Sequence, residues 1–249
     1  MRSQLHSPPG HRQRFRPFLL ALLATGLSAP TLADCPPPGE DAAAHFAVCS
    51  QRAEAGDAVA QRQLGNLYRS GAGVAQSDAE ALTWYRKAAA QGDVVAHYNL
   101  GVMYDNGYGV DQDHEEAGRW YEQAVARDYG PAMYNLALQH EYGMGRPKDY
   151  AAAMDLYTRS AEQGEPWAQF AIALLYDKGL GVERDPVQAY MWFDIVGDGH
   201  EHAIHNRDSI AEELTPEQIE EGQRLAREWR AARPQLFGEQ EGASAAARP

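Results

Sequence analysis

The chain repeats itself every 36 residues between residues 57 and 200, and this repeat constrains its fold more than any other feature. Four segments align without a gap, at 57–92, 93–128, 129–164 and 165–200. Repeats of about 20–50 residues are typical of solenoids, in which each unit buries its apolar face against its neighbours. The recurring columns include Ala60, Ala96, Ala132 and Ala168; Gly71, Gly107, Gly143 and Gly179; Gly73, Gly109, Gly145 and Gly181; and Ala81, Ala117, Ala153 and Ala189.

Each unit contains two helical patterns joined by a Gly-x-Gly turn. In the first unit, Ala60, Leu64 and Leu67 are spaced three and four residues apart, which places them on one helical face. Ala81 and Tyr85 have the same spacing in the second pattern. Glycine tolerates a positive φ, so the first glycine can end one helix and the second can turn the chain back. A good N-cap residue precedes each second helix: Ser77, Asp113, Asp149 and Asp185.

These patterns predict an all-α fold, an α-solenoid of antiparallel helix pairs with a helical cap at each end. Residues 40–56 resemble the second half of a repeat, and we expect 34–56 to form the N-terminal cap. Residues 201–233 are expected to form the C-terminal cap, in which Thr215 and Gln218 have the spacing of a capping box. The remaining residues, 234–249, are rich in Gly, Ala, Ser and charge, and we expect a disordered tail.

Aromatic side chains recur at the repeat period, which favours a place in the core over a ring-binding surface. We expect six of them to be core residues: Trp84, Trp120, Trp192, Tyr68, Tyr104 and Tyr176.

Residues 1–33 have the order of a secretory signal peptide. Basic residues come first, the apolar run 18–27 follows, and small residues lead to Ala33, after which we expect cleavage. The alternatives are an N-terminal anchor, which about ten apolar residues are too few to build as a membrane span, and a lipoprotein, which Asp34 before Cys35 disfavours. The protein is therefore expected in the periplasm or secreted.

Charge argues against two classes of partner. The full sequence has 22 basic and 35 acidic residues, for a net charge of −13. Nucleic acids and anionic membranes are bound by basic surfaces, so neither is expected as a partner. No apolar stretch of the sequence reaches the roughly 18 residues that a membrane span requires.

Cys35 and Cys49 are the only cysteines, and both would lie in the exported part. In an oxidising compartment we expect them to form a disulfide. The alternative is a reactive thiol pair, although the two-residue spacing of a redox motif is missing.

The repeat resembles the Sel-one-like (Sel1) repeat, a longer cousin of the tetratricopeptide repeat. The resemblance rests on Ala-His-Tyr-Asn-Leu-Gly-Val-Met-Tyr at 96–104, Gly-Tyr-Gly-Val at 107–110 and the segment from Ala117 to Tyr121. It covers 57–200 and implies a non-catalytic scaffold or adaptor that binds a protein or peptide. It also implies that asparagines of the first helices hold a peptide backbone, namely Asn66, Asn99 and Asn135.

One column near the end of the first helix is mostly acidic. It contains Arg69, Asp105, Glu141 and Asp177. The functional interpretation is an acidic stripe that binds a basic partner segment, and the alternative is a contribution to solubility alone.

The sequence contains no nucleophile motif or phosphate loop, and we expect neither catalysis nor a cofactor. One alternative is a metal-binding protein that uses His200, His202 and His205, with Glu220 or Glu221 as a ligand from a second helix. Another is a hydrolase, because some cysteine-rich proteins with this repeat are described as β-lactamases. Those relatives have paired cysteines in every repeat, and this sequence has none within 57–200.

Overall fold

The computed structural model describes residues 35, 41–197 and 200–237, and all regular structure in these ranges is helical. The predicted all-α fold is confirmed. The helices are α1 (Ala42–Glu54), α2 (Ala58–Ser70), α3 (Asp78–Ala90), α4 (Val94–Asn106), α5 (His114–Val125), α6 (Gly130–Tyr142), α7 (Tyr150–Ala161), α8 (Pro166–Lys178), α9 (Pro186–Val196), α10 (Glu201–Ala211), α11 (Pro216–Ala231) and α12 (Pro234–Phe237).

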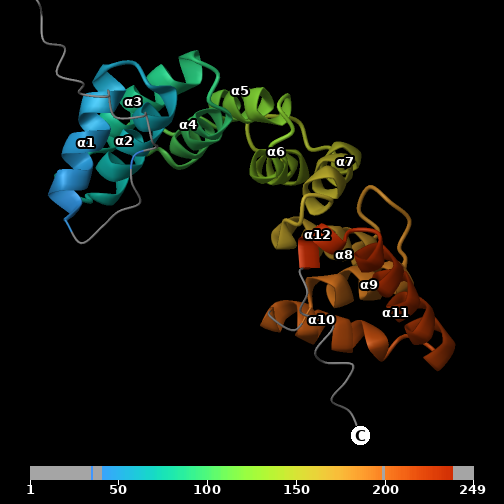
Figure 1. Cartoon of the computed structure of the whole chain (residues 1–249). Coiled ribbons are helices and arrows are strands. Elements are labelled where there is room, and N and C mark those ends of the chain that lie inside the picture. Colours follow the sequence, from blue (N-terminus) through green and yellow to red (C-terminus); the bar gives the residue numbers. More distant parts are fainter. Residues whose placement is uncertain (1–34, 36–40, 198–199, 238–249) are drawn as a thin grey trace, which may run out of the picture. The chain divides into compact units, whose positions relative to one another are not determined.

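The helices pack in the order in which they follow one another in sequence (Figure 1). Each repeat supplies one pair, from α2 with α3 to α8 with α9, and the second helix of each pair packs on the first helix of the next. Helix α1 covers α2, while α10 and α11 both pack on α9. Each helix therefore contacts mainly its neighbours, as expected of a solenoid.

The predicted caps explain where the helices begin and end. Gly107 follows α4 with φ of 72°, and its N–H donates to the carbonyl of Met103. The Asp113 side chain accepts from the backbone N–H of Glu116 at 2.9 Å and so caps α5. Thr215 and Gln218 form the predicted capping box of α11. The equivalent N-caps of the other repeats, Ser77, Asp149 and Asp185, also accept backbone bonds.

The second glycine of each turn touches the preceding repeat, which the sequence did not reveal. Gly109 has φ of 69°, and a Cβ there would lie 2.7 Å from the carbonyl carbon of Asp78, at the start of α3. Only glycine allows this approach without displacing backbone. Gly73, Gly145 and Gly181 meet Ala42, His114 and Tyr150 in the same way.

The deepest aromatic column lies one residue after the predicted tryptophan column. Tyr85, Tyr121, Tyr157 and Phe193 are at most 1% exposed. Among the six predicted core residues, Trp192 is buried, but the other five are only partly buried and pack against the edges of the core clusters. These five, Trp84, Trp120, Tyr68, Tyr104 and Tyr176, therefore border the core and do not fill its centre.

The two cysteines lie in one buried cluster beside α1 and α2. The structure holds them as free thiols, with Cys35 4% and Cys49 0% exposed. Burial, together with the neighbouring Cys35, raises the pKa of Cys49 to about 12. The disulfide stays a prediction.

Three sequence predictions concern the two ends of the protein. The signal peptide at 1–33 lies outside the described residues. The expected disorder from 234 onwards is wrong for its first four residues, which form α12, where Phe237 packs on Trp229 at 5.8 Å between ring centroids. None of the described helices combines the length and apolar composition that crossing a membrane requires.

Candidate functional site

The first helix of each repeat has one side that keeps solvent exposure, and we call it the first-helix face. Along α2 and α8 its residues are spaced three and four apart, which is the period of one helical side, and in α4 and α6 an adjacent tyrosine and asparagine begin the same stripe. Helices α4 and α6 lie on the lower side of α5 in Figure 1. The face consists of Val59, Arg62, Asn66 and Arg69; Tyr98, Asn99, Val102 and Asp105; Tyr134, Asn135, Leu138 and Glu141; and Trp167, Phe170, Leu174 and Asp177.

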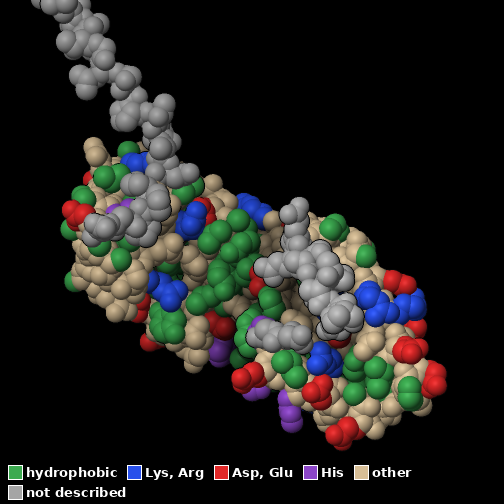
Figure 2. Space-filling model, turned by 60° about the horizontal axis from the view of Figure 1, so that its bottom comes forward, with side chains coloured by type: hydrophobic (Ala, Val, Ile, Leu, Met, Phe, Trp, Pro, Cys, Tyr) green, Lys and Arg blue, Asp and Glu red, His purple; other side chains and the backbone are tan. Residues whose placement is uncertain are grey.

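The face changes from polar to apolar from the first repeat to the last. Arg62 begins a 36-residue column that continues as Tyr98, Tyr134 and Phe170. Trp167, beside Phe170, is 49% exposed, and their ring centroids lie 6.4 Å apart. Figure 2, which brings the lower side of Figure 1 forward, shows hydrophobic side chains gathered in the middle of the molecule. This column was not among the predicted site residues, although the same alignment displays it.

The aromatic side chains of the face rest on the buried column of the second helices. Ring centroids lie 6.1 Å apart for Tyr98 and Tyr121, and 5.8 Å apart for Tyr134 and Tyr157. Phe170 meets Phe193 edge-on at 5.4 Å. These contacts hold the partly buried rings in place, so the face presents a rigid apolar surface.

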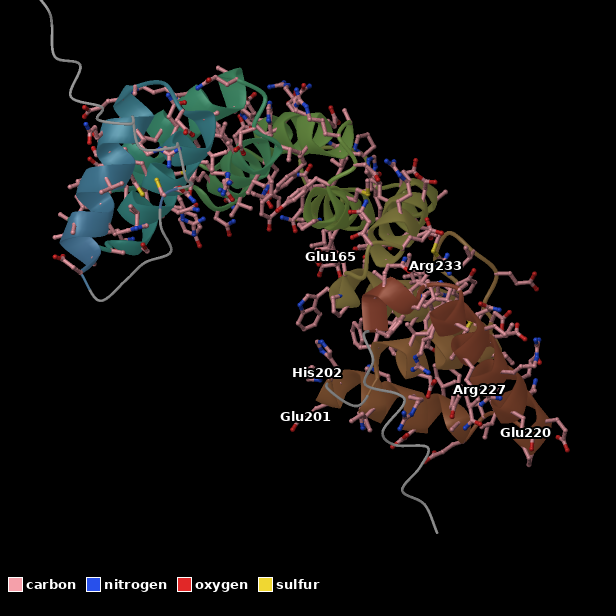
Figure 3. The ribbon with its side chains drawn as sticks, viewed as in Figure 1. Glu165, Glu201, His202, Glu220, Arg227 and Arg233 are labelled. Carbon is pink, nitrogen blue, oxygen red and sulfur yellow. The ribbon has the colours of Figure 1, made fainter. Side chains whose placement is uncertain are left out.

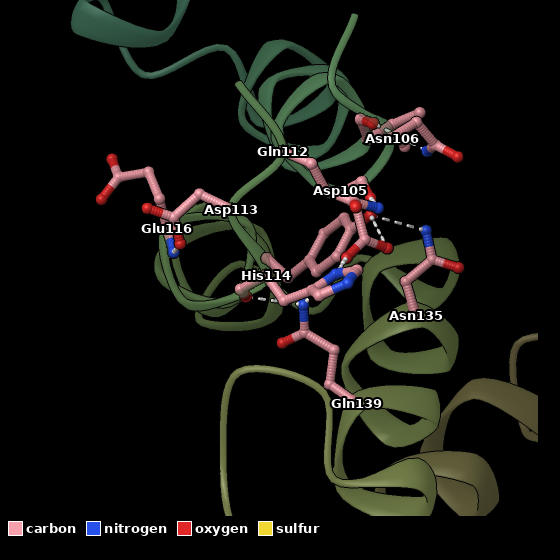
Figure 4. Close-up of polar contacts among 10 residues, drawn as sticks. Asp105, Asn106, Gln112, Asp113, His114, Glu116, Asn135 and Gln139 are labelled. Atoms are coloured by element: carbon pink, nitrogen blue, oxygen red, sulfur yellow. Dashed lines mark hydrogen bonds and ion pairs between the residues drawn. The ribbon is translucent and has the colours of Figure 1, made fainter. Parts of the chain in front are cut away.

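Asp105 is engaged within the protein (Figure 4). Its carboxylate lies 2.7 Å from Nδ1 of His114 and accepts from the Tyr121 hydroxyl at 3.3 Å. Gln139 of α6 also donates to it, at 3.3 Å, and to the backbone carbonyl of His114. Burial first, and then the negative charge of Asp105, raises the pKa of Tyr121. The carboxylate therefore joins two repeats.

The same arrangement recurs in the next repeat and changes in the last. Glu141 accepts from the hydroxyl of Tyr157 at 2.7 Å, and burial and this bond raise the pKa of Tyr157. In the last repeat Phe193 has no hydroxyl, and Asp177 pairs with Arg184 at 3.5 Å instead. The predicted acidic stripe is thus a set of intramolecular acceptors, each matched to its own repeat.

The first repeat reverses the charge in this column. Arg69 stands where the other repeats have a carboxylate, and the Tyr85 hydroxyl donates instead to Oδ1 of Asn66 at 2.7 Å. Burial raises the pKa of Tyr85 to about 12, while Arg69 and Arg62 act in the opposite direction. A pocket of about 220 Å³ opens here, lined by Asn66, Arg69, Ser70 and Tyr85.

The three asparagines predicted to hold a peptide also bond within the protein. Asn99 donates to Oδ1 of Asn66 at 3.4 Å, and Asn135 donates to the Tyr121 hydroxyl at 3.2 Å. The structure therefore brings Asn66 and Asn99 together, and joins Asn135 to Asp105 through Tyr121. Glu141 and Asp177 belong to the separate pairs of their own repeats.

The predicted histidine cluster is not gathered around one point in the part of the chain that the structure describes. Among the described residues, no three His, Cys, Asp or Glu side chains gather as ligands. The ring of His200 packs edge-on against Trp167 at 4.9 Å, while His202 and His205 are exposed on α10. Figure 3 shows Glu220 far from His202, towards the opposite end of this helical region. The metal-binding alternative therefore lacks its second-helix ligand.

Known proteins share this repeat. The Sel1 repeat family matches residues 58–93, 94–129, 130–165 and 168–195. A Sel1 repeat protein from Oxalobacter formigenes is 33% identical with a TM-score of 0.58, over 63% of this chain and 65% of its own. A protective antigen present in uropathogenic Escherichia coli strains, which displays an SLR fold, is 28% identical with a TM-score of 0.55, over 82% of this chain and 52% of its own. The protein thus spans less than two thirds of either structure's length. No curated protein matches it.

Proposed function

Because the protein belongs to the Sel1 repeat family, whose fold is typically a protein-interaction scaffold, we propose that it binds a protein or peptide on the first-helix face, without catalysis. The observation that carries this proposal is the apolar part of the face. Trp167 of this face is 49% exposed, and Tyr142, which follows Glu141 at the end of α6 and adjoins the face, is 59% exposed. Partly buried aromatic and aliphatic side chains of the face lie along α4, α6 and α8. Grouped exposed apolar side chains are typical of binding surfaces.

The chemistry of the partner follows from which side chains of the face are free to contact it. Asp105, Glu141 and Asp177 already have partners within the protein, so a basic partner would have to displace those bonds. Contact with the exposed rings would displace no hydrogen bond or ion pair of this kind. We therefore assign the affinity to apolar and aromatic contacts, with a partner segment that offers apolar side chains.

Two features support a non-catalytic role. The buried Cys49 thiol has a raised pKa, which disfavours the thiolate that a nucleophile requires. Both cysteines lie before residue 57, outside the repeats, unlike the paired cysteines of the β-lactamase-like relatives.

We also propose that the protein is exported and works in the periplasm or outside the cell. The support is the basic, apolar and small-residue order of 1–33. Expression in a bacterial host followed by mass spectrometry of the exported fraction should give a mature protein that begins at Asp34. A product that keeps Met1 and stays in the cytoplasm would contradict the proposal.

Binding is best tested by affinity capture with matched variants of residues 34–249. The test variant combines Trp167→Ala and Tyr142→Ala, which remove exposed rings and should leave the fold intact. The control is Val48→Ser, which removes a 42% exposed apolar side chain from α1, outside the face. Circular dichroism checks that all three proteins fold alike.

The expected result is a protein that the native form and the control retain and that the test variant loses. The proposal fails if the same proteins are retained by all three, because the apolar face would then contribute nothing to binding.

A further inference from the structure

The pocket of the first repeat carries a cationic side chain, Arg69, in a column where the other repeats carry a carboxylate. In the three later repeats the equivalent position carries Asp105, Glu141 or Asp177. The guanidinium of Arg69 forms no ion pair with any described residue, in a protein with a net charge of −13. A carboxylate is the group that this column holds elsewhere, and here none is supplied by the neighbouring helices.

The donors in the pocket are held in place. The Arg69 guanidinium carbon lies 5.4 Å from the centre of the Tyr108 ring, a cation–π contact that helps to position the guanidinium. Both Tyr85 and Asn99 donate to Oδ1 of Asn66, so the amide nitrogen of Asn66 remains as a donor. The pocket is therefore lined by a guanidinium and by an amide whose N–H₂ has no partner among the described residues.

The pocket is open where a ligand would enter. Asn66 and Ser70 are exposed, whereas Tyr85 is 1% exposed and forms the buried wall. A volume of about 220 Å³ suits a carboxylate with the first atoms of the molecule that bears it, rather than a larger cofactor. Arg69 also acts electrostatically on the Tyr98 hydroxyl, which belongs to the aromatic column of the next repeat.

We propose that this pocket binds a carboxylate of the protein or peptide partner, through Arg69 and the Asn66 amide. Arginine binds carboxylates with two parallel hydrogen bonds, which makes it more selective than a point charge. This inference rests on the proposed function, because the apolar remainder of the partner would continue along the first-helix face. The carboxylate is either the free carboxyl terminus of the partner or one of its Asp or Glu side chains.

The test uses small probes, so that it does not depend on knowing the partner. N-acetyl-leucine represents a carboxyl terminus, N-acetyl-aspartate methylamide represents a side chain, and N-acetyl-leucine amide is the neutral control. Each is titrated into residues 34–249 while the NMR signals of the Arg69 Nε–H and the Asn66 side-chain amide are followed. We expect saturable shifts from one or both carboxylates and none from the amide.

Arg69→Asp is the decisive variant, because it restores the acidic residue of the other repeats and gives Tyr85 a second acceptor. It should fold and weaken carboxylate binding about tenfold or more, as expected for the loss of a charged hydrogen bond. Lys178→Asp makes the same charge change on α8 and should leave binding unchanged. The inference is overturned if the amide shifts the same signals equally, or if both variants weaken binding alike.

This outcome is separable from the proposed function. If the carboxylates fail to bind while Trp167→Ala with Tyr142→Ala still loses the captured partner, only the pocket assignment falls. If neither experiment gives a difference, the first-helix face itself is not the binding surface.

Discussion

At the scale of single residues, the tyrosine–carboxylate pair explains why the acidic column exists. Tyr157 is completely buried, and its hydroxyl donates to Glu141 at 2.7 Å. Removing the hydroxyl deletes a charge-assisted bond, while the partly exposed carboxylate regains water. We therefore expect Tyr157→Phe to lower the free energy of unfolding by about 1–2 kcal/mol, measured by urea denaturation.

The matched control is a double-mutant cycle with Glu141→Gln. If the two side chains act as a pair, the double variant should cost less than the sum of the single variants, by about 0.5–2 kcal/mol. Additive costs would mean that Tyr157 stabilises the fold by packing alone.

Glu165 gives a pH-dependent prediction. It is the N-cap residue of α8, and its side chain makes no capping hydrogen bond. Burial raises the pKa of its carboxyl above the ordinary value of 4.5. The folded state therefore holds this proton more strongly than the unfolded state. The resulting loss of stability is absent below pH 4.5, develops as the pH rises from 4.5 to the folded-state pKa, and is complete above it. Glu165→Gln should raise the melting temperature at pH 7 and lose this advantage below pH 4.5. An equal gain at both pH values would contradict the assignment.

At the scale of elements, the two turn glycines separate local backbone strain from contact between repeats. Gly107 and Gly109 have nearly the same φ, 72° and 69°. A Cβ at Gly107 would lie 3.3 Å from the backbone nitrogen of Gln112, a tight contact that a small shift relieves, whereas at Gly109 it would meet the backbone of α3 at 2.7 Å. Gly107→Ala should lower the free energy of unfolding by about 1–2 kcal/mol, as expected for an L-residue in the left-handed region.

Gly109→Ala should lower it by about 1–3 kcal/mol more, because the backbone of the neighbouring helix must move. Equal costs by thermal or urea denaturation would show that the turn does not bear on the preceding repeat.

The repeat alignment predicted the elements well, because helix periodicity, N-caps and C-terminal glycines all recur at one spacing. It does not show which side of each helix is buried most deeply in the core. Neighbouring columns such as Trp120 and Tyr121 differ by only about 100° around the helix axis, and the buried side depends on how the next repeat packs. It also missed the internal role of Asp105 and Glu141. The sequence signal for this role is a tyrosine 16 residues after the acid, as in Asp105 with Tyr121 and Glu141 with Tyr157. The first and last repeats lack the pair, because Arg69 replaces the acid and Phe193 replaces the tyrosine.

At the scale of the whole molecule, buried residues form three clusters in sequence order rather than one centre. The first lies around Cys49 and Leu64, and the last extends from Ala117 to Ala226. In such a stack, stability is a sum of repeat and neighbour contributions, so damage at one end should stay near that end.

Trp229 of α11 tests this expectation, because it closes the C-terminal end of the last cluster. Its ring lies 5.3 Å from Trp192 and 5.8 Å from Phe237 between centroids. Since Trp229 is only partly buried, Trp229→Ala should cost about 2–3 kcal/mol, below the range of about 3–5 for a fully buried ring. Hydrogen exchange should then speed up in α9 and α11 and stay unchanged in α2 and α3. Uniform acceleration in all helices would mean instead that the protein unfolds as one cooperative unit, and that its repeats do not carry their stability locally.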